Sequence, residues 1–256
     1  MLYLRSALFN LAFYTETAII LILGIPLFLL PRKYLRWATR QWSRLSIWLV
    51  GVIAGTKYEL RGIEHLPHGP AFLAAKHQSM WDTLALAAFL DDPAVVLKRE
   101  LMHLPLYGWY AKKARMIAVD RGAHSKAVRD MLARAEQVIA DGRQIVIFPQ
   151  GTRVAPGTTH EYKPGSAALY RRLGLPCVPV AVNSGLFWPR RKFLHHPGTI
   201  IMEFLEPIEA GLNRREFMTE LERRIETASN RLLAEADLPG PPPISSRPVD
   251  NLSTLL

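Results

Sequence analysis

A histidine and an aspartate five positions apart are the residues best placed to move a proton. His77 and Asp82 lie in the stretch Lys-His-Gln-Ser-Met-Trp-Asp-Thr, residues 76–83, directly after an apolar run. A carboxylate that accepts from one imidazole nitrogen fixes the tautomer and leaves the other nitrogen free as a base. Residues i and i+5 lie about 140° apart around a helix, so the pair can meet only where a strand turns into a helix. Taken alone, such a pair is more often a helix cap beside a surface histidine, and further residues must decide.

The elements that must position this pair are short apolar runs that alternate with helical patterns. Such alternation predicts one mixed-sheet α/β domain with buried strands. The candidate strands are 57–61, 71–75, 94–98, 116–119, 144–148, 177–182 and 199–204. Capping residues and apolar periodicity predict helices from Ser125 to Asp141-Gly142, from Pro164 to Gly174, and over about 214–236.

The N-terminal part of the chain has a different character. Residues 6–30 are almost continuously apolar and long enough to cross a hydrocarbon core of about 30 Å, whereas the apolar run 45–55 is too short. Either the first segment spans the bilayer, or both segments form a hairpin in the inner leaflet; two core helices of a soluble protein are the third interpretation. We therefore divide the chain into membrane-anchoring helices (1–55), an α/β domain (56–238) and a disordered Pro-, Gly- and Ser-rich tail (239–256).

Charge and cysteine content limit the function. The 256-residue chain carries a formal net charge of +10, which favours an anionic partner such as a bilayer surface, a phosphorylated substrate or nucleic acid. Its single cysteine, Cys177, excludes a disulfide framework and a cysteine-based zinc site, and its apolar surroundings predict a buried position. A basic belt, in which aromatic residues alternate with cations, is expected at the headgroups on the cytoplasmic side. Its cations are Arg32, Lys33, Arg36, Arg40 and Arg44.

Three turns after strands are candidate anion sites. The turn 149–153 contains Gly151, which lets a ligand approach the backbone, and Thr152 and Arg153, of which the arginine can bind phosphate bidentately. Lys163 stands at a predicted helix start, and Arg121 follows the strand 116–119. Because strands of an α/β sheet tend to bind ligands at their carboxyl ends, we expect these turns to lie along one edge with His77.

Together, these motifs resemble those of the PlsC-type 1-acyl-sn-glycerol-3-phosphate acyltransferases, over about residues 57–208. The family block N-H-x4-D is similar to residues 76–82, its arginine block to residues 117–121, F-P-E-G-T-R to residues 148–153, and its V-P-V strand to residues 178–180. Two positions depart from the pattern. Lys76 replaces asparagine, which adds a positive charge beside the base or helps to hold a phosphate. Gln150 replaces glutamate, so a negative charge there is lost, although a glutamine can still orient the turn.

The resemblance implies transfer of a fatty acyl group from acyl-ACP or acyl-CoA to the sn-2 hydroxyl of lysophosphatidic acid, a membrane lipid, which makes phosphatidic acid. His77 and Asp82 are then catalytic, and the residues that bind substrate are Arg121, Gly151, Thr152, Arg153 and Lys163. No metal and no cofactor is implied. The catalytic domain is expected on the cytoplasmic side of the cell membrane, and the sequence does not determine the oligomeric state or the acyl-chain length.

Other functions stay open at this point. The nearest alternative is an acyltransferase for another lyso-lipid, such as a lyso-ornithine lipid. A serine esterase is disfavoured because the sequence lacks G-x-S-x-G. A membrane-anchored, non-enzymatic anion-binding protein is the alternative from another class, but no helix-turn-helix, RNP or zinc signature favours nucleic acid. His195 and His196 are expected in a solvated loop beside residues 190–192 rather than at a metal.

Overall fold

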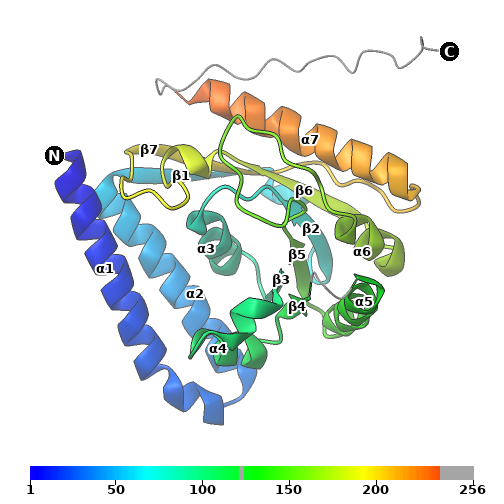
Figure 1. Cartoon of the computed structure of the whole chain (residues 1–256), viewed down its shortest axis with the longest axis horizontal. Coiled ribbons are helices and arrows are strands. Elements are labelled where there is room, and N and C mark those ends of the chain that lie inside the picture. The colour runs from blue at the N-terminus through cyan, green and yellow to red at the C-terminus, as the bar shows by residue number, and fades with distance from the viewer. Residues whose placement is uncertain (121–123, 237–256) are drawn as a thin grey trace.

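A computed structural model describes residues 1–120 and 124–236, and within these ranges it shows a seven-stranded mixed sheet with helices on both faces (Figure 1). All seven predicted strands are present, and each end agrees with the prediction to within one residue. The strands are β1 Thr56–Arg61, β2 Ala71–Ala75, β3 Pro93–Lys98, β4 Ile117–Val119, β5 Gln144–Ile147, β6 Cys177–Val182 and β7 Gly198–Phe204. The α/β fold is confirmed. The tail beyond residue 236 lies outside the described residues.

The strand order places two motif-bearing strands side by side at the centre of the sheet. The order is β1-β7-β6-β2-β5-β3-β4, and all neighbouring pairs are parallel except β6 and β7. In the β2 and β5 pair, Ala74 lies opposite Ile147. Both strands therefore end at the same edge, and the segments that follow them, 76–83 and 149–153, start next to each other.

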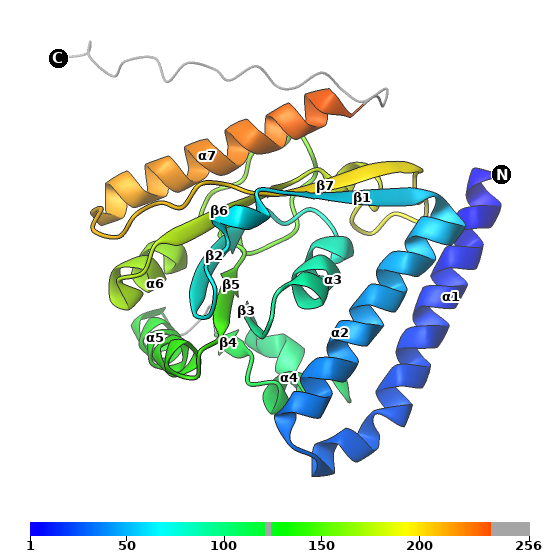
Figure 2. The same cartoon turned by 180° about the vertical axis from the view of Figure 1, so that it is seen from behind.

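Side chains on the two faces of the sheet form separate apolar clusters. Along β2, Ala71, Leu73 and Ala75 join one cluster and Phe72 and Ala74 the other, because successive strand residues point to opposite faces. The first face is covered by α3 Met80–Phe89 and by the N-terminal helices; the second is covered by α5 His124–Ala140, α6 Gly165–Leu173 and α7 Arg214–Glu235 (Figures 1 and 2). These last three helices match the predicted ones, although α5 begins one residue before the expected Ser125 cap. Cys177 is free and buried, as expected.

The N-terminal residues form a helical hairpin that packs on the domain. Helix α1 Leu2–Leu23 is followed by a 3-10 helix, Ile25–Leu29, and by the antiparallel α2 Arg32–Leu49 (Figure 2). The Trp42 indole of α2 donates to the Thr17 hydroxyl of α1 at 3.1 Å. Closer to the start of α1, Phe9 packs edge-on against Trp188 and His195. His195 is thus only 1% exposed, and the expectation that it lies in a solvated loop is wrong.

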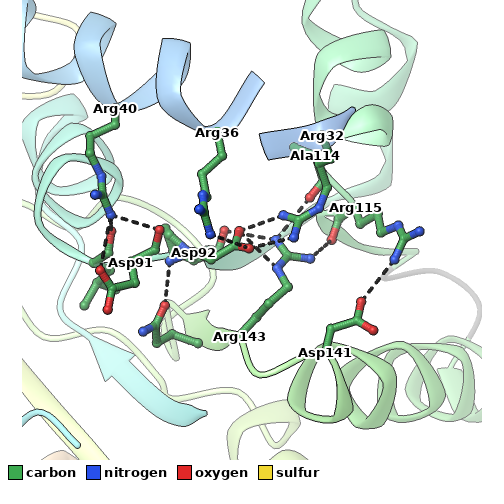
Figure 3. Close-up of polar contacts among 12 residues, drawn as sticks. Arg32, Arg36, Arg40, Asp91, Asp92, Ala114, Arg115, Asp141 and Arg143 are labelled. Carbon is green, nitrogen blue, oxygen red and sulfur yellow. Dashed lines mark hydrogen bonds and ion pairs between the residues drawn. The ribbon is translucent and has the colours of Figure 1, made fainter. Parts of the chain in front are cut away.

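Three cations of the predicted basic belt point toward the domain. Arg32, Arg36 and Arg40 are spaced four residues apart and so share one face of α2. Arg32 and Arg36 bind the Asp92 carboxylate, and Arg40 donates to the main-chain carbonyl of Asp91 at 2.9 Å (Figure 3). We expected the whole belt at the headgroups, but these three side chains contact the domain and hold the hairpin to it.

Asp92 also binds an arginine from inside the domain. The Arg143 guanidinium is 2% exposed and lies 3.1 Å from the Asp92 carboxylate; it also donates to the carbonyl of Ala114 at 3.1 Å (Figure 3). Burial by itself raises the pKa of Asp92, but the hydrogen bonds from Arg32 and the charges of the surrounding arginines outweigh it and leave the pKa below its ordinary value. The carboxylate is therefore ionised and joins α2 to the sheet.

Candidate active site

His77 and Asp82 meet at the junction of β2 and α3, as their spacing requires. The Nδ1 atom of His77 lies 2.9 Å from Oδ2 of Asp82. His77 precedes α3, whereas Asp82 occupies the third position of its first turn, with Ser79 as the N-cap residue. An Nδ1–H that donates to a carboxylate leaves Nε2 unprotonated, which is the form that accepts a proton. The imidazole ring stacks on Phe148, with 3.9 Å between the ring centroids, so its orientation is fixed from both sides.

The Asp82 carboxylate is fully buried and receives several donors. The main-chain amides of Gln78 and Ser79 donate to its Oδ2 atom at 2.7 and 2.9 Å. Its other oxygen accepts from the hydroxyl of Ser184. These donors and the positive end of the helix dipole favour a negative charge here. The arrangement therefore holds a carboxylate behind the imidazole, where it can stabilise an imidazolium.

The turn after β5 lies against the His77 turn. The amide of Val154 donates to the carbonyl of His77 at 2.8 Å and joins the two segments. Gly151 has a φ of 68°, the left-handed region that favours glycine, and its amide donates to the carbonyl of Phe148 at 2.8 Å. The glycine thus closes a tight turn that brings Thr152 and Arg153 toward the histidine.

A second arginine lies beside Arg153. Arg190 donates to the Thr152 hydroxyl at 3.1 Å and to the carbonyl of Arg153 at 2.8 Å. Burial lowers the pKa of Arg153, and the positive charge of Arg190 lowers it further, whereas the charge of Asp82 opposes both. Two guanidinium groups that repel each other near the His77–Asp82 pair form a place where an anion is stabilised.

Lys76 and Gln150, the two departures from the family pattern, are both 2% exposed. The Lys76 ammonium donates to both carboxylate oxygens of Glu226 in α7, at 2.6 and 2.7 Å. Gln150 approaches the same carboxylate at 3.5 Å. The Lys76 ammonium is therefore directed toward α7, and the interpretation that it helps to hold a phosphate does not fit its position.

The other two cations that we expected at the site are Lys163 and Arg121. The amide of Lys163 donates to the carbonyl of Pro149 at 2.8 Å, but its ammonium pairs with Glu161 at 2.5 Å, and both side chains are about half exposed or more. Arg121 lies outside the described residues; the strand that precedes it, β4, stands at the edge of the sheet. In the described part of the chain, no group of three or more His, Cys, Asp or Glu side chains has the arrangement of a metal site.

Sequence reasoning missed four residues that contact the predicted site. They are Phe148, Ser184, Arg190 and Glu226. Arg190 belongs to the basic run 190–192, beside the histidines that we expected in a solvated loop, and no local pattern distinguishes it from its neighbours. Ser184 and Glu226 lie 102 and 150 positions from their partners. Neither position carries a local signal, so only the fold reveals these contacts.

Comparison with known proteins agrees with this fold and motif arrangement. A sequence model of the Acyltransferase family matches residues 57–183. A 1-acyl-sn-glycerol-3-phosphate acyltransferase of Pseudomonas aeruginosa is 34% identical over 204 residues, which make up 80% of this chain and 79% of that protein. One of Saccharomyces cerevisiae is 28% identical over 216 residues, 80% of this chain and 69% of that protein.

A solved structure has the same fold. The crystal structure of PlsC, the 1-acyl-sn-glycerophosphate acyltransferase of Thermotoga maritima, matches with a TM-score of 0.76 and covers 91% of this chain and 98% of that one. The sequence identity is 22%, so this likeness concerns the fold. Fold and sequence together place the chain among the O-acyltransferases. It belongs to the 1-acyl-sn-glycerol-3-phosphate acyltransferase family.

Proposed function

We propose that the protein transfers a fatty acyl group from an acyl thioester, acyl-ACP or acyl-CoA, to the sn-2 hydroxyl of lysophosphatidic acid. The observation that carries this proposal is the 2.9 Å contact between His77 and the buried Asp82, next to the arginine pair Arg153 and Arg190. A base beside an anion site suits an acceptor that carries its hydroxyl group near a phosphate.

In the proposed reaction, Nε2 of His77 takes the proton of the acceptor hydroxyl while the hydroxyl oxygen attacks the thioester carbonyl carbon. The carbonyl π pair moves to oxygen and forms a tetrahedral oxyanion. Its collapse breaks the carbon–sulfur bond, and the imidazolium returns the proton to the departing thiolate. Asp82 holds the ring in place and stabilises its charged form. The thioester is already activated, so no covalent acyl-enzyme is needed, and alignment of the substrates supplies much of the rate enhancement.

The oxyanion needs donors from the turn after β5. The amide of Gly151 is directed at the carbonyl of Phe148, so it does not suit this role. The next two amides, those of Thr152 and Arg153, directly precede Val154, whose amide donates to the carbonyl of His77, and we assign the oxyanion to them. In this assignment the glycine shapes the turn and its neighbours bind the charge.

The acceptor phosphate is assigned to Arg153 and Arg190. Their mutual repulsion is relieved when a dianion lies between them, and the Thr152 hydroxyl holds Arg190 in position for that contact. The ammonium of Lys163, which pairs with Glu161, is not part of this site.

The hairpin is assigned to one leaflet of the membrane. Helix α1 is long and apolar enough to span, but both of its ends contact the domain. Near the start, the Tyr3 ring stacks on Phe193 and the Ser6 hydroxyl accepts from the amide of His195 at 3.0 Å; near the end, Tyr110 of helix α4 Tyr107–Lys113 donates to the carbonyl of Leu21. A spanning helix about 33 Å long has its ends on opposite sides of a bilayer, where one domain cannot contact both.

The outward faces of the hairpin are apolar and suit this position. Its exposed large apolar side chains include Leu4, Leu8, Leu11, Ile19, Ile22, Leu23, Ile25, Leu29, Trp37 and Trp48. A surface of this kind enters the headgroup and acyl boundary of a leaflet, where a single-chain phospholipid also resides. The lipid acceptor and the base are then at the same depth, while the carrier-bound donor arrives from the cytoplasm.

The test of function is acyl transfer from a labelled thioester in mixed micelles or vesicles. The parent protein and His77→Ala are compared with lysophosphatidic acid and with a lyso-ornithine lipid, each with acyl-ACP and with acyl-CoA. We expect transfer to lysophosphatidic acid by the parent and its loss in a folded His77→Ala protein. Transfer only to the lyso-ornithine lipid would overturn the assigned acceptor, and full activity of the variant would overturn the assigned base.

The membrane assignment is tested by thiol labelling. The only cysteine is buried and its pKa is raised by burial, so an introduced cysteine is labelled selectively. In Leu4→Cys the new thiol replaces a side chain that is 61% exposed. An impermeant maleimide added to intact cells is expected to leave it unlabelled and to label it once detergent has removed the lipid. Labelling in intact cells would favour the spanning arrangement instead.

A further inference from the structure

Glu226 of helix α7 gathers polar groups from the two turns that carry the motifs. Its carboxylate accepts two hydrogen bonds from Lys76, at 2.6 and 2.7 Å, and one from the hydroxyl of Tyr162 at 2.8 Å. The side-chain amide of Gln150 lies 3.5 Å from the same oxygen. Burial and then the negative charge of Glu226 raise the pKa of Tyr162, which therefore serves as a donor. Lys76 comes from the end of β2 and Gln150 from the turn after β5.

The two departures from the family motifs thus meet at one carboxylate. The motif letters have asparagine at position 76 and glutamate at position 150, whereas this chain has Lys76 and Gln150. Position 150 of this chain carries no negative charge, but the carboxylate of Glu226 lies beside it and pairs with the ammonium of Lys76. If position 150 carried a glutamate, its carboxylate and that of Glu226 would repel each other around one buried ammonium. The glutamine at this position can instead donate a hydrogen bond to Glu226.

We propose that Glu226 is a positioning residue for acyl transfer, which replaces from helix α7 the carboxylate that the motif carries at position 150. With Lys76 and Gln150 it holds the His77 turn and the 149–153 turn in register. The proposal rests on the proposed function for its catalytic consequence, whereas the contacts of Glu226 with Lys76 and Gln150 are seen in the structure itself.

The contacts explain how a residue away from the base affects it. Lys76 is covalently next to His77, and Gln150 lies between Phe148, which stacks on the His77 ring, and Gly151. The Lys76 side chain is 2% exposed and that of Glu226 24%. Removal of the carboxylate leaves a buried ammonium without a counter-charge, which must reach water by moving the end of β2. Such movement displaces His77 from the turn that holds the substrate.

The experiment is a charge-relocation series measured in two ways, by steady-state acyl transfer and by thermal unfolding of the full chain. The variants are Glu226→Gln, Gln150→Glu, and the double variant Gln150→Glu/Glu226→Gln, which returns the carboxylate to position 150. Glu222→Gln is the matched control, since Glu222 is an exposed carboxylate one turn away on α7 that interacts with Lys76 only through its charge.

We expect Glu226→Gln to lower kcat roughly 10- to 100-fold with a smaller effect on the acceptor KM, because misplacement of a base affects the chemical step. Its Tm should fall by about 5–10 °C. The double variant should recover most of both losses, Gln150→Glu alone should lose activity, and Glu222→Gln should resemble the parent.

Three outcomes would contradict the proposal. If Glu226→Gln has the same kcat as the parent, Glu226 does not position the base. A lowered Tm with unchanged kcat and KM leaves a structural contact only. If the double variant recovers neither kcat nor Tm, a carboxylate at position 150 cannot replace the one at position 226. A parent inactive toward lysophosphatidic acid refutes the proposed function separately, and the Tm series then decides whether the charge has moved.

Discussion

Arg32 of helix α2 donates two hydrogen bonds, of 2.7 and 2.6 Å, to the two carboxylate oxygens of Asp92, the residue directly before β3 (Figure 3). This bidentate pair joins the N-terminal hairpin to the catalytic domain. Arg143 reaches the same carboxylate from the domain side, at 3.1 Å. The hairpin is therefore held to the domain by ion pairs as well as by the packing of Phe9 and Phe13 on Trp188. These contacts fix the distance between the candidate active site and the apolar surface of the hairpin.

Asp92→Asn should destabilise the protein by about 3 kcal/mol, because Arg143, which is 2% exposed, loses its counter-charge. For a chain of this size the corresponding fall in Tm is roughly 6–12 °C. Asp91→Asn is the matched control: its carboxylate is 82% exposed and 3.5 Å from Arg40, so the change should stay within about 0.5 kcal/mol. Thermal unfolding of the three proteins in detergent is the measurement, and equal Tm values would contradict the assigned role.

Asp82→Asn should lower kcat by about 10²- to 10⁴-fold while the acceptor KM changes little. An asparagine has one acceptor oxygen for the donors that now converge on the carboxylate, and its amide cannot stabilise an imidazolium. Ser184→Ala removes one donor to Asp82 but keeps the contact with His77, so its loss should be far smaller. Steady-state kinetics of both variants, with circular dichroism to confirm folding, distinguish orientation of the base from general damage to the site.

Arg153→Ala and Arg190→Ala should each raise the KM for lysophosphatidic acid by about 10- to 100-fold, the worth of a charge-assisted contact to phosphate. The KM for the thioester donor should stay near the parental value. Arg172→Ala, which removes an exposed arginine paired with Glu136 on the far helices, is the control for loss of positive charge. An unchanged acceptor KM in either variant would remove that arginine from the phosphate site.

Acid should weaken folding through His195. Burial lowers the pKa of this histidine from 6.5 to about 4, so between these values the unfolded chain binds a proton that the folded chain does not. Stability from this group is complete above pH 6.5 and falls as the pH drops, by about 2 kcal/mol from pH 7 to pH 5. In His195→Leu this component should disappear. Parallel pH curves of Tm for parent and variant would contradict the assignment.

The sequence determined the strands, the contact between His77 and Asp82, and the tight turn, because the forces behind them are local. Buried strands of a parallel sheet are short apolar runs, and the strand-to-helix junction that brings His77 to Asp82 is fixed by residues within a few positions. The left-handed φ of Gly151 is likewise a property of its own turn. These features could be predicted without knowing which residues from distant parts of the sequence pack against them.

Only the tertiary structure decided which long polar side chains meet. The spacing of Arg32, Arg36 and Arg40 placed them on one face of a helix, but whether that face meets lipid or Asp92 depends on how the hairpin packs. Similarly, Arg190 adjoins Arg153 because two loops converge at the carboxyl edge of the sheet. Glu226 meets Lys76 because α7 crosses back over that edge, 150 residues along the chain. Charges pair through space, and a sequence specifies such pairs only through the fold that brings them together.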